Sequence, residues 1–463
     1  MHKHTDLEAE INTVELVDTH EHLLSDDQWS GDNSKLVEAS RQSNPNSEWS
    51  DVTPDILQDL FLNYAPSDLE VAGATEDAIK RLYNPSAGDI ESRFSGIREA
   101  WEAMQYTGYG EAVRLIAREV YGLDELTPEG LEQAQKKLEE LRQPGERLRL
   151  LRDVARLDHV QIDDFRWACI PDESGPDFFL YDLSWANFAN GDLRINEIQE
   201  ETGLEVTKLD DLREALARIF QRYAPCAIAV KAQHAYTRTL RWEERSDEDA
   251  ARALAAVVAG GELDEPTRLI LGDWCWARGV ELAVEHDLPF KLHTGHHAGT
   301  KQMPIDWVRA GNLCPLLARY PEARFVLMHI SYPYNDELVS IAKHYPNVWV
   351  DLCWAWSIDP HSSSEFVRRF LHAVPINKLF AFGGDTMWPT SAIAYSFQAR
   401  KGLRHALEAE IDAGYLNERQ AIEIARRLMR ENQYACFDID GTRSAIRTQL
   451  ADRTGQDATP TVA

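Results

Sequence analysis

Two histidines stand one residue apart in the stretch VDTHEHLLSD, residues 17–26, directly after a short apolar run. If residues 14–22 form a strand, His20 and His22 project from the same face, because side chains alternate along an extended chain. Two adjacent imidazoles are good ligands for a divalent metal ion. The alternative is a polar strand end at which both histidines only hydrogen-bond their neighbours. The rest of the chain has to separate these two interpretations.

Four further polar residues share one feature, which is that each ends a different apolar run. They are Lys231 in IAVKAQH, His293 in LPFKLHTG, His329 in FVLMHIS and Asp385 in FAFGGDTMW. Each has a structural alternative: a lysine that reaches water, a histidine hydrogen-bonded inside the core, or, for His296 and His297 nearby, ordinary loop histidines. An aspartate in such a position is costly to bury without a cation or donor beside it.

The elements that must position these residues are eight short apolar runs, separated by stretches with helical spacing. Alternating strands and helices predict an α/β fold, specifically a (β/α)8 TIM-type barrel. In such a barrel the carboxyl ends of all strands meet at one face, so His20, His22 and the four residues above would converge there. A shared metal would satisfy several of these buried polar groups at once. The expected strands are residues 13–18, 159–164, 177–185, 226–232, 288–294, 324–330, 347–353 and 378–385.

The segment of about residues 30–150 does not fit a short crossover between two strands. Its apolar spacing is helical throughout, which predicts a helical insertion after the first strand that leans over the barrel mouth. A separate N-terminal helical domain is the alternative, but it would have to share the first strand. We therefore expect one barrel domain over residues 1–453 and a flexible tail over 454–463.

Composition limits the possible partners. The chain has 463 residues, with 48 Lys and Arg against 77 Asp and Glu, for a net charge of −29. This charge disfavours nucleic acid and anionic membrane surfaces as partners. The six cysteines form no paired motif, and neither a signal peptide nor a run of about 18 apolar residues is found. These features predict a cytoplasmic enzyme that acts on a small molecule.

The four segments DTHEH, KLHTG, FVLMHISYPY and FGGD together resemble the amidohydrolase superfamily of metal-dependent barrels. The likeness is strongest to the branch of uronate isomerases, carboxy-lyase relatives and amidohydrolase domains fused to a glutamine-synthetase-like domain. It extends over nearly the whole chain, including the inserted TGYGEAVR. No single one of these motifs is specific, and none determines the substrate.

The resemblance implies that His20, His22 and Asp385 are metal ligands and that His293 is a ligand or a metal-side hydrogen-bond donor. His329 matches a position that binds a second metal or polarises the substrate. Lys231 matches a lysine that is carbamylated in binuclear members. Because one metal is common in this branch, we expect a single divalent ion, zinc, with manganese or iron as alternatives. A homo-oligomer is also expected from the resemblance.

The expected chemistry is hydrolysis of an amide, lactone or related bond by a metal-activated water. A metal lowers the pKa of bound water to about 7, Asp385 would transfer its proton, and His329 or Lys231 would stabilise the oxyanion. Uronate isomerisation or decarboxylation at the same metal, and a catalytically silent binding barrel, are the alternatives. An arginine can grip a carboxylate, so Arg238 suggests an acidic substrate. The candidate substrate-binding residues are Arg238, Tyr236, Tyr332, Trp354, Trp388 and Arg98, with Tyr334, Trp356, Arg93 and Trp101 as further ones.

Overall fold

Eight parallel strands form the centre of the computed structural model, which describes residues 4–31, 55–299 and 302–457. Each strand pairs with the next one in the chain, from β1 to β8. Every expected strand overlaps an observed one, so the barrel prediction is confirmed. The strands are β1 (Leu16–Glu21), β2 (Leu157–Ile162), β3 (Phe179–Ser184), β4 (Ala227–Ala232), β5 (Phe290–Leu292), β6 (Phe325–Leu327), β7 (Val348–Asp351) and β8 (Leu379–Phe380).

Backbone hydrogen bonds between β1 and the segment after β8 bring the two edges of the sheet together. The Thr19 amide donates to the Phe382 carbonyl at 3.2 Å, and the Asp385 amide donates to the His20 carbonyl at 2.9 Å. The segments DTHEH and FGGD, more than three hundred residues apart in the chain, therefore lie side by side.

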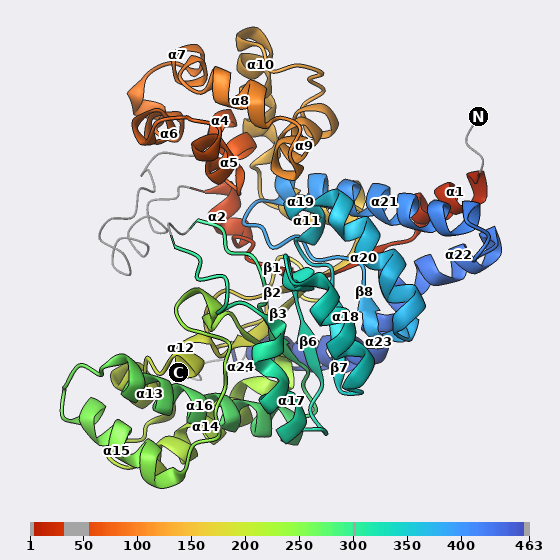
Figure 1. Ribbon diagram of the computed structural model, residues 1–463. Helices are drawn as coiled ribbons and strands as arrows, with labels where there is room; N and C mark the ends of the chain where they lie inside the picture. The colour runs from red at the N-terminus through yellow and green to blue at the C-terminus, as the bar shows by residue number, and fades with distance from the viewer. Residues whose placement is uncertain (1–3, 32–54, 300–301, 458–463) are drawn as a thin grey trace.

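Helices cover the outside of the barrel (Figure 1). In α14, for example, Leu209, Leu212, Leu216 and Ile219 are buried at helical spacing and form the stripe that packs inward. The helices after β3 are α12 (Ala186–Asn190), α13 (Ile195–Thr202), α14 (Leu209–Tyr223), α15 (Asp247–Val258), α16 (Glu265–Glu285), α17 (Cys314–Arg319), α18 (Asn335–His344), α19 (Ala355–Ile358), α20 (Pro360–Ala373), α21 (Pro389–Asp412), α22 (Glu418–Arg426), α23 (Asn432–Cys436) and α24 (Ile439–Asp457).

The described part of the segment between β1 and β2 is mainly helical, as expected, and forms a lobe above one side of the barrel (Figure 1). Residues 32–54 of the expected insertion lie outside the described residues. Ser, Thr and Asp side chains cap several of its helices by accepting amide hydrogen bonds in the first turn, for example Asp55, Thr75 and Thr107. The helices are α2 (Asp26–Ser30), α4 (Ile56–Phe61), α5 (Ala65–Val71), α6 (Glu76–Leu82), α7 (Ile90–Ser95), α8 (Arg98–Met104), α9 (Gly108–Leu115), α10 (Pro128–Leu141) and α11 (Glu146–Arg149).

A buried carboxylate joins this lobe to the barrel. Asp59 of α4 accepts hydrogen bonds from Thr390 of α21 at 2.9 Å and from Tyr121 at 2.7 Å. Burial raises the pKa of Asp59 to about 6. Nearby, Gly108 lies so close to α19 that an added Cβ would be 2.1 Å from the Ser357 carbonyl oxygen. The lobe is thus packed onto α19 and α21, the helices that follow β7 and β8.

Replacing Asp59 by Asn should make stability less dependent on pH. Because the pKa of Asp59 is raised in the folded state, its ionisation costs stability as pH rises from about 4 to 6. The free energy of unfolding of Asp59→Asn, relative to wild type, should therefore increase by about 2 kcal/mol between pH 4.5 and pH 7.5. Denaturant unfolding at both pH values measures this. Asp124→Asn, an exposed site in the same lobe, is the control, and an equal increase there would contradict the assignment.

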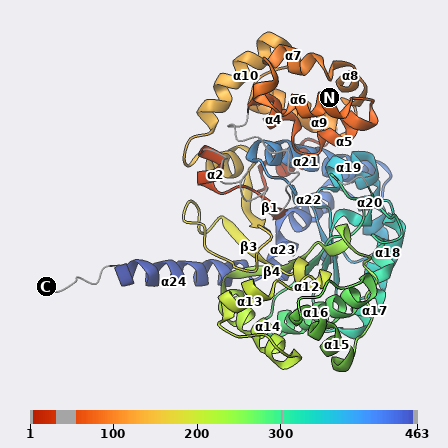
Figure 2. The same cartoon turned by 90° about the vertical axis from the view of Figure 1, so that its left-hand side faces the viewer.

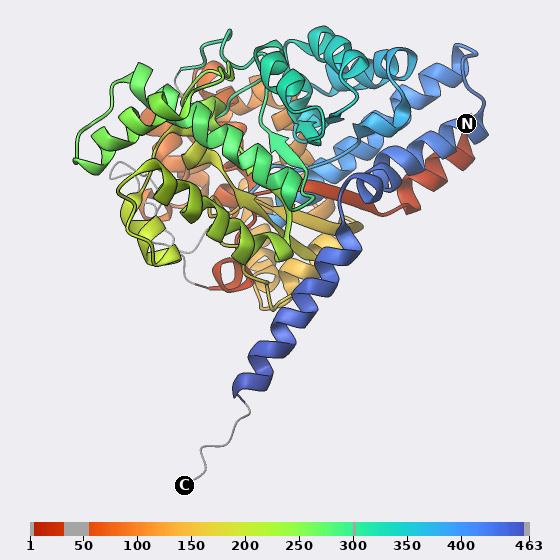
Figure 3. The same cartoon turned by 90° about the horizontal axis from the view of Figure 1, so that it is seen from below.

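Both ends of the described chain are helical. Residues 5–13 form α1 (Thr5–Thr13), which packs beside α22. At the other end, α24 continues to Asp457, so the first part of the expected tail of residues 454–463 is helical, while 458–463 lie outside the described residues. Phe437 and Ile446 belong to one buried apolar cluster with strand residues such as Leu180, Ile228 and Phe380, whereas the end of α24 projects from the body (Figures 2 and 3). No helix in the described ranges is long and apolar enough to span a membrane.

Candidate metal centre

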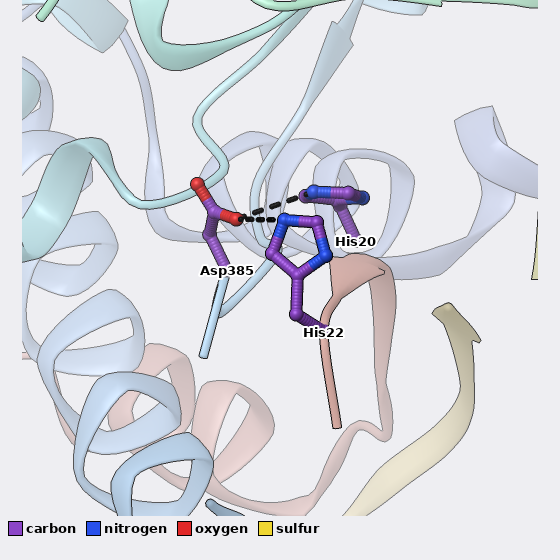
Figure 4. Close-up of side chains that lie close together, drawn as sticks. All are labelled: His20, His22 and Asp385. Atoms are coloured by element: carbon purple, nitrogen blue, oxygen red, sulfur yellow. Dashed lines mark ion pairs between the residues drawn. The ribbon is translucent and has the colours of Figure 1, made fainter. Parts of the chain in front are cut away.

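Three side chains, from β1 and from the segments that follow β1 and β8, converge on one point (Figure 4). His20 lies in β1, His22 follows it directly, and Asp385 follows β8. Asp385 Oδ1 is 3.2 Å from His20 Nε2 and 3.3 Å from His22 Nε2. The ligand atoms of all three residues lie within 4.8 Å of one another. His20 is fully buried and Asp385 is only 5% exposed, so water does not shield this cluster.

In both imidazoles Nδ1 faces an oxygen atom on the side away from Asp385, which leaves Nε2 directed at Asp385. His22 Nδ1 lies 2.6 Å from the Asp163 carbonyl oxygen, and because a carbonyl only accepts, Nδ1 carries the proton. His20 Nδ1 lies 3.8 Å from Asp182 Oδ2, too far for a hydrogen bond, and has no hydrogen-bond partner among the described residues. The contact of His22 with Asp163 is of the kind that orients histidine ligands of metal ions.

The charge states of His20 and Asp385 suit a divalent cation. Burial, together with the positive charge of Lys231, holds the pKa of His20 well below its usual range. Burial alone would raise the pKa of Asp385, but His20, His22 and His329 hold it well below its usual range. The pKa of His22 is raised, because its ion pair with Asp385 outweighs burial. Imidazole nitrogens around an ionised carboxylate form a donor set typical of zinc and similar ions.

His329 and Lys231 complete the centre. His329 Nδ1 donates to the Cys353 carbonyl oxygen at 2.9 Å, while its Nε2 is buried, has no hydrogen-bond partner among the described residues and lies 3.7 Å from Asp385 Oδ2. Burial lowers the pKa of His329 to about 4, so the ring is neutral and Nε2 presents a lone pair. Lys231 Nζ lies 3.1 Å from His20 Nε2. Cys353 Sγ also lies close to the ligand atoms of His329 and Asp385.

His293, expected as a ligand or a metal-side hydrogen-bond donor, is not among the groups of ligand atoms that lie close together in the described residues. Its Nε2 lies 3.0 Å from the His296 carbonyl oxygen and donates to it. Its ring centroid is 4.3 Å from that of His329. The geometry therefore fits a residue that packs against His329 better than one that binds the ion.

Three of the candidate substrate-binding residues lie around the centre. The Tyr236 ring is 4.7 Å from that of His293 and stacks on His297 at 4.3 Å. The Trp354 ring is 5.4 Å from that of His329. Tyr332 reaches the edge of His296, with the ring centroids 6.3 Å apart. These side chains form an aromatic wall beside the metal ligands.

The other three candidates are held by contacts of their own, and their contact with substrate stays a prediction. Arg238 is fully buried, pairs with Asp273 at 2.5 Å and donates to the carbonyls of Ala189, Thr239 and Arg241, so its guanidinium is already occupied. Trp388 is buried against Trp29. Arg98 is exposed on α8, over the Phe94 ring, in a surface hollow of the lobe.

Two residues of the site carried no local signal in the sequence. Tyr64, from the inserted lobe, donates its hydroxyl hydrogen to the Asp385 carbonyl oxygen at 2.5 Å and packs on Trp354 with ring centroids 4.5 Å apart. Phe165 stacks on His22 at 4.4 Å and is 56% exposed. The contact of Tyr64 joins residues that are 321 positions apart, which only the folded chain brings together.

Tyr64→Phe should weaken metal binding while leaving the aromatic stack intact. The lost hydroxyl no longer holds the backbone of Asp385, and the loss of such outer contacts typically costs about 10-fold or more in metal affinity. Zinc titration against a competing chelator measures the effect. Tyr83→Phe is a matched control, since Tyr83 donates to the Phe61 carbonyl at 3.1 Å within the same lobe. Equal zinc affinities in the two variants would exclude a role for Tyr64 at the metal.

Comparison with known proteins agrees with this geometry. A family model described as amidohydrolase matches residues 169–418. The chain belongs to this amidohydrolase family. It is also 26% identical to Protein fluG of Emericella nidulans over 231 residues, which are 47% of this chain and 26% of fluG. The match thus spans about a quarter of that relative's length.

Solved structures share the whole fold of this amidohydrolase. Uronate isomerase of Thermotoga maritima superposes with a TM-score of 0.75 at 14% identity, covering 93% of this chain and 96% of that one. Glucuronate isomerase of Caulobacter crescentus superposes with a TM-score of 0.70 at 15% identity, covering 94% of this chain and 93% of that one. A protein of Lactobacillus casei superposes with a TM-score of 0.62 at 13% identity, covering 94% of this chain and 98% of that one. A metal-dependent hydrolase function is ascribed to that protein. The family and the His–Asp cluster together identify a metal-dependent enzyme of the amidohydrolase superfamily.

Proposed function

We propose that this amidohydrolase hydrolyses an amide, lactone or related bond of a small molecule, with one zinc ion at His20, His22 and Asp385. The observation that carries the proposal is the geometry of Asp385, whose Oδ1 contacts both imidazoles while its Oδ2 faces His329. One carboxylate can thus hold the cation and also accept a proton beside it. Manganese and iron are the alternative ions.

Each residue of the centre then has a defined task. A bound cation would supply a Lewis acid that lowers the pKa of water to about 7. Asp385 accepts the proton of the attacking water and returns it to the leaving group. Lys231 Nζ donates a hydrogen bond to the substrate oxygen on which negative charge develops. His329, with its proton on Nδ1, accepts a hydrogen bond at Nε2 and orients the water or a substrate hydroxyl.

The expectation of an acidic substrate is weaker than the sequence implied. It depended on Arg238, which is paired with Asp273 away from the centre. Among the described residues, Lys231 is the cation next to the metal ligands, and carbamylation of this lysine is the alternative to its role as a donor. The substrate class we propose is therefore defined by a carbonyl group that faces Lys231, with a carboxylate as an optional feature.

Isomerisation of a uronate is the second candidate, favoured by the superposition of nearly the entire chain on two uronate isomerases. In that reaction the same cation would bind substrate oxygens, while Asp385 or His329 moves protons between carbon and oxygen. Decarboxylation of a small acid would use the same residues. The three reactions leave different products, so one experiment separates them.

The test is a substrate panel offered to the zinc-loaded protein in water enriched in ¹⁸O. N-acyl amino acids and lactones report hydrolysis through ¹⁸O in the carboxylic acid product. D-glucuronate and D-galacturonate report isomerisation through a ketose signal in NMR spectra, and aromatic acids report decarboxylation through released carbon dioxide. Chelator-treated protein is the control. Ketose formation alone would replace hydrolysis by isomerisation, and no product with any class would favour a silent binding barrel.

A further inference from the structure

Asp385 has a backbone conformation that few non-glycine residues adopt. Its φ is +58°, in the left-handed region, where aspartate is tolerated better than most residues. The residue is almost fully buried, and its amide donates to the His20 carbonyl oxygen at 2.9 Å. Strained backbone at a functional site persists when its surroundings hold it in place. The contacts on both sides of Asp385 therefore have to be identified.

Two buried carboxylates of β1 hold the amides on either side of Asp385. The Gly384 amide donates to Asp18 Oδ1 at 3.2 Å. The Thr386 amide donates to Glu21 Oε2 through a short hydrogen bond. Both carboxylates are completely buried. They lie in the same strand as His20, so one strand supplies a metal ligand and the contacts that orient the opposite ligand.

Glu21 also fills the space beside Gly384. A Cβ added at position 384 would lie 1.9 Å from Glu21 Oε1 and 2.8 Å from the carboxyl carbon. A real Cβ cannot approach an oxygen so closely, so either the carboxylate or the backbone would have to move. Gly384, the second glycine of FGGD, thus lets Glu21 pack directly on the main chain, and any side chain at this position would have to displace the hydrogen-bonded Glu21 carboxyl group.

We propose that Glu21, together with Asp18, is a positioning residue that fixes the backbone of residues 384–386 so that the Asp385 carboxylate meets both histidines. The proposal rests on the metal site put forward above and assigns a task to a residue of DTHEH that does not bind the ion. Loss of Glu21 should allow residues 384–386 to relax and Asp385 to turn away from His20 and His22. Partners of this kind typically contribute about 10–100-fold to metal affinity.

The experiment measures zinc affinity by chelator competition, and thermal unfolding of the zinc-free protein, in full-length variants. Glu21→Ala should lower zinc affinity by about 10–100-fold. Glu21→Gln, which keeps the shape and an acceptor oxygen for the Thr386 amide, should retain affinity close to that of wild type. If Glu21→Ala acted through a general loss of structure, the unfolding temperature of its zinc-free form would fall, and Glu21→Gln would show the same fall.

Gly384→Ala tests the same contact from the other side and leaves β1 unchanged. In wild type the new methyl group displaces the Glu21 carboxylate and should weaken zinc binding. In the Glu21→Ala background the space is free, so Gly384→Ala should cause little further loss. This non-additivity is expected only if the two residues act through one contact. If Glu21→Ala does not fold, Gly384→Ala and Glu21→Gln alone still test the prediction.

A matched pair elsewhere provides the control. The Gly311 amide donates to Glu337 Oε1 at 2.7 Å, and a Cβ at position 311 would lie 2.7 Å from the same oxygen. Glu337→Ala and Gly311→Ala should change thermal stability and leave zinc affinity unaltered. Wild-type zinc affinity in Glu21→Ala, or additive losses in the double variant, would overturn the proposal. Failure of the wild-type protein itself to bind zinc would instead refute the proposed metal site.

Discussion

Asp385→Asn is expected to lower turnover by about 10²–10⁴-fold, the usual contribution of a general acid–base group, while the protein stays folded. Asparagine cannot accept a proton at neutral pH, and it removes the negative charge that faces His20 and His22. Asparagine tolerates the left-handed backbone of this position as well as aspartate does. Steady-state kinetics on the substrate identified by the panel, together with circular dichroism, measures the effect.

Asp287→Asn is the control for this substitution. Asp287 also has a positive φ, of +53°, but lies on the surface after α16, where its exposed carboxylate pairs with Arg324. Asp287→Asn therefore makes the same side-chain change at a residue with a similar positive φ, away from the metal centre. Undiminished turnover in Asp385→Asn would remove Asp385 from proton transfer, and an equal loss in both variants would point to a backbone effect.

Zinc should stabilise the protein strongly against unfolding. At a free concentration about 100 times its dissociation constant, a ligand that binds only the folded state adds about 2.7 kcal/mol to the free energy of unfolding. In His22→Asn the zinc-dependent stabilisation should largely disappear, because one of three clustered ligands is lost. Chemical denaturation of chelator-treated protein, with and without added zinc, measures this difference.

His344→Asn controls for the general effect of removing a histidine. His344 is exposed near the end of α18, so this variant should gain the full stabilisation from zinc. If His22→Asn gained as much as wild type, the ion would have to bind at another site. The chelator-treated wild-type protein should also lack turnover, which joins this measurement to the proposed reaction.

The positions of the three proposed metal ligands could be predicted from the ends of the strands. Apolar runs followed by polar residues predicted eight strands, and closure of a parallel barrel requires their carboxyl ends to meet at one face. His20, His22 and Asp385 converge there because the segment after β8 forms backbone hydrogen bonds with β1. Since strand periodicity and barrel topology depend on short segments and on their order, this part of the site was predictable from the residues.

Local sequence gave no means of predicting which side chains would already be occupied. Arg238 had the right chemistry for a substrate carboxylate, yet its guanidinium is taken by Asp273, 35 residues further along the chain. His293 had the right strand position, yet its Nε2 donates to the nearby His296 carbonyl. The partner of Arg238 depends on packing between elements, and no local pattern records that packing.

The amino-acid sequence by itself determined the barrel, the helical insertion and the strand ends that carry the histidines and Asp385. Only the tertiary structure decided that Tyr64 reaches Asp385 from the insertion and that Glu21 packs directly against Gly384. The physical reason is the separation along the chain between the residues involved. Periodicity acts over a few residues along the chain, whereas these contacts join residues more than three hundred positions apart and exist only when the barrel closes and the insertion packs onto it.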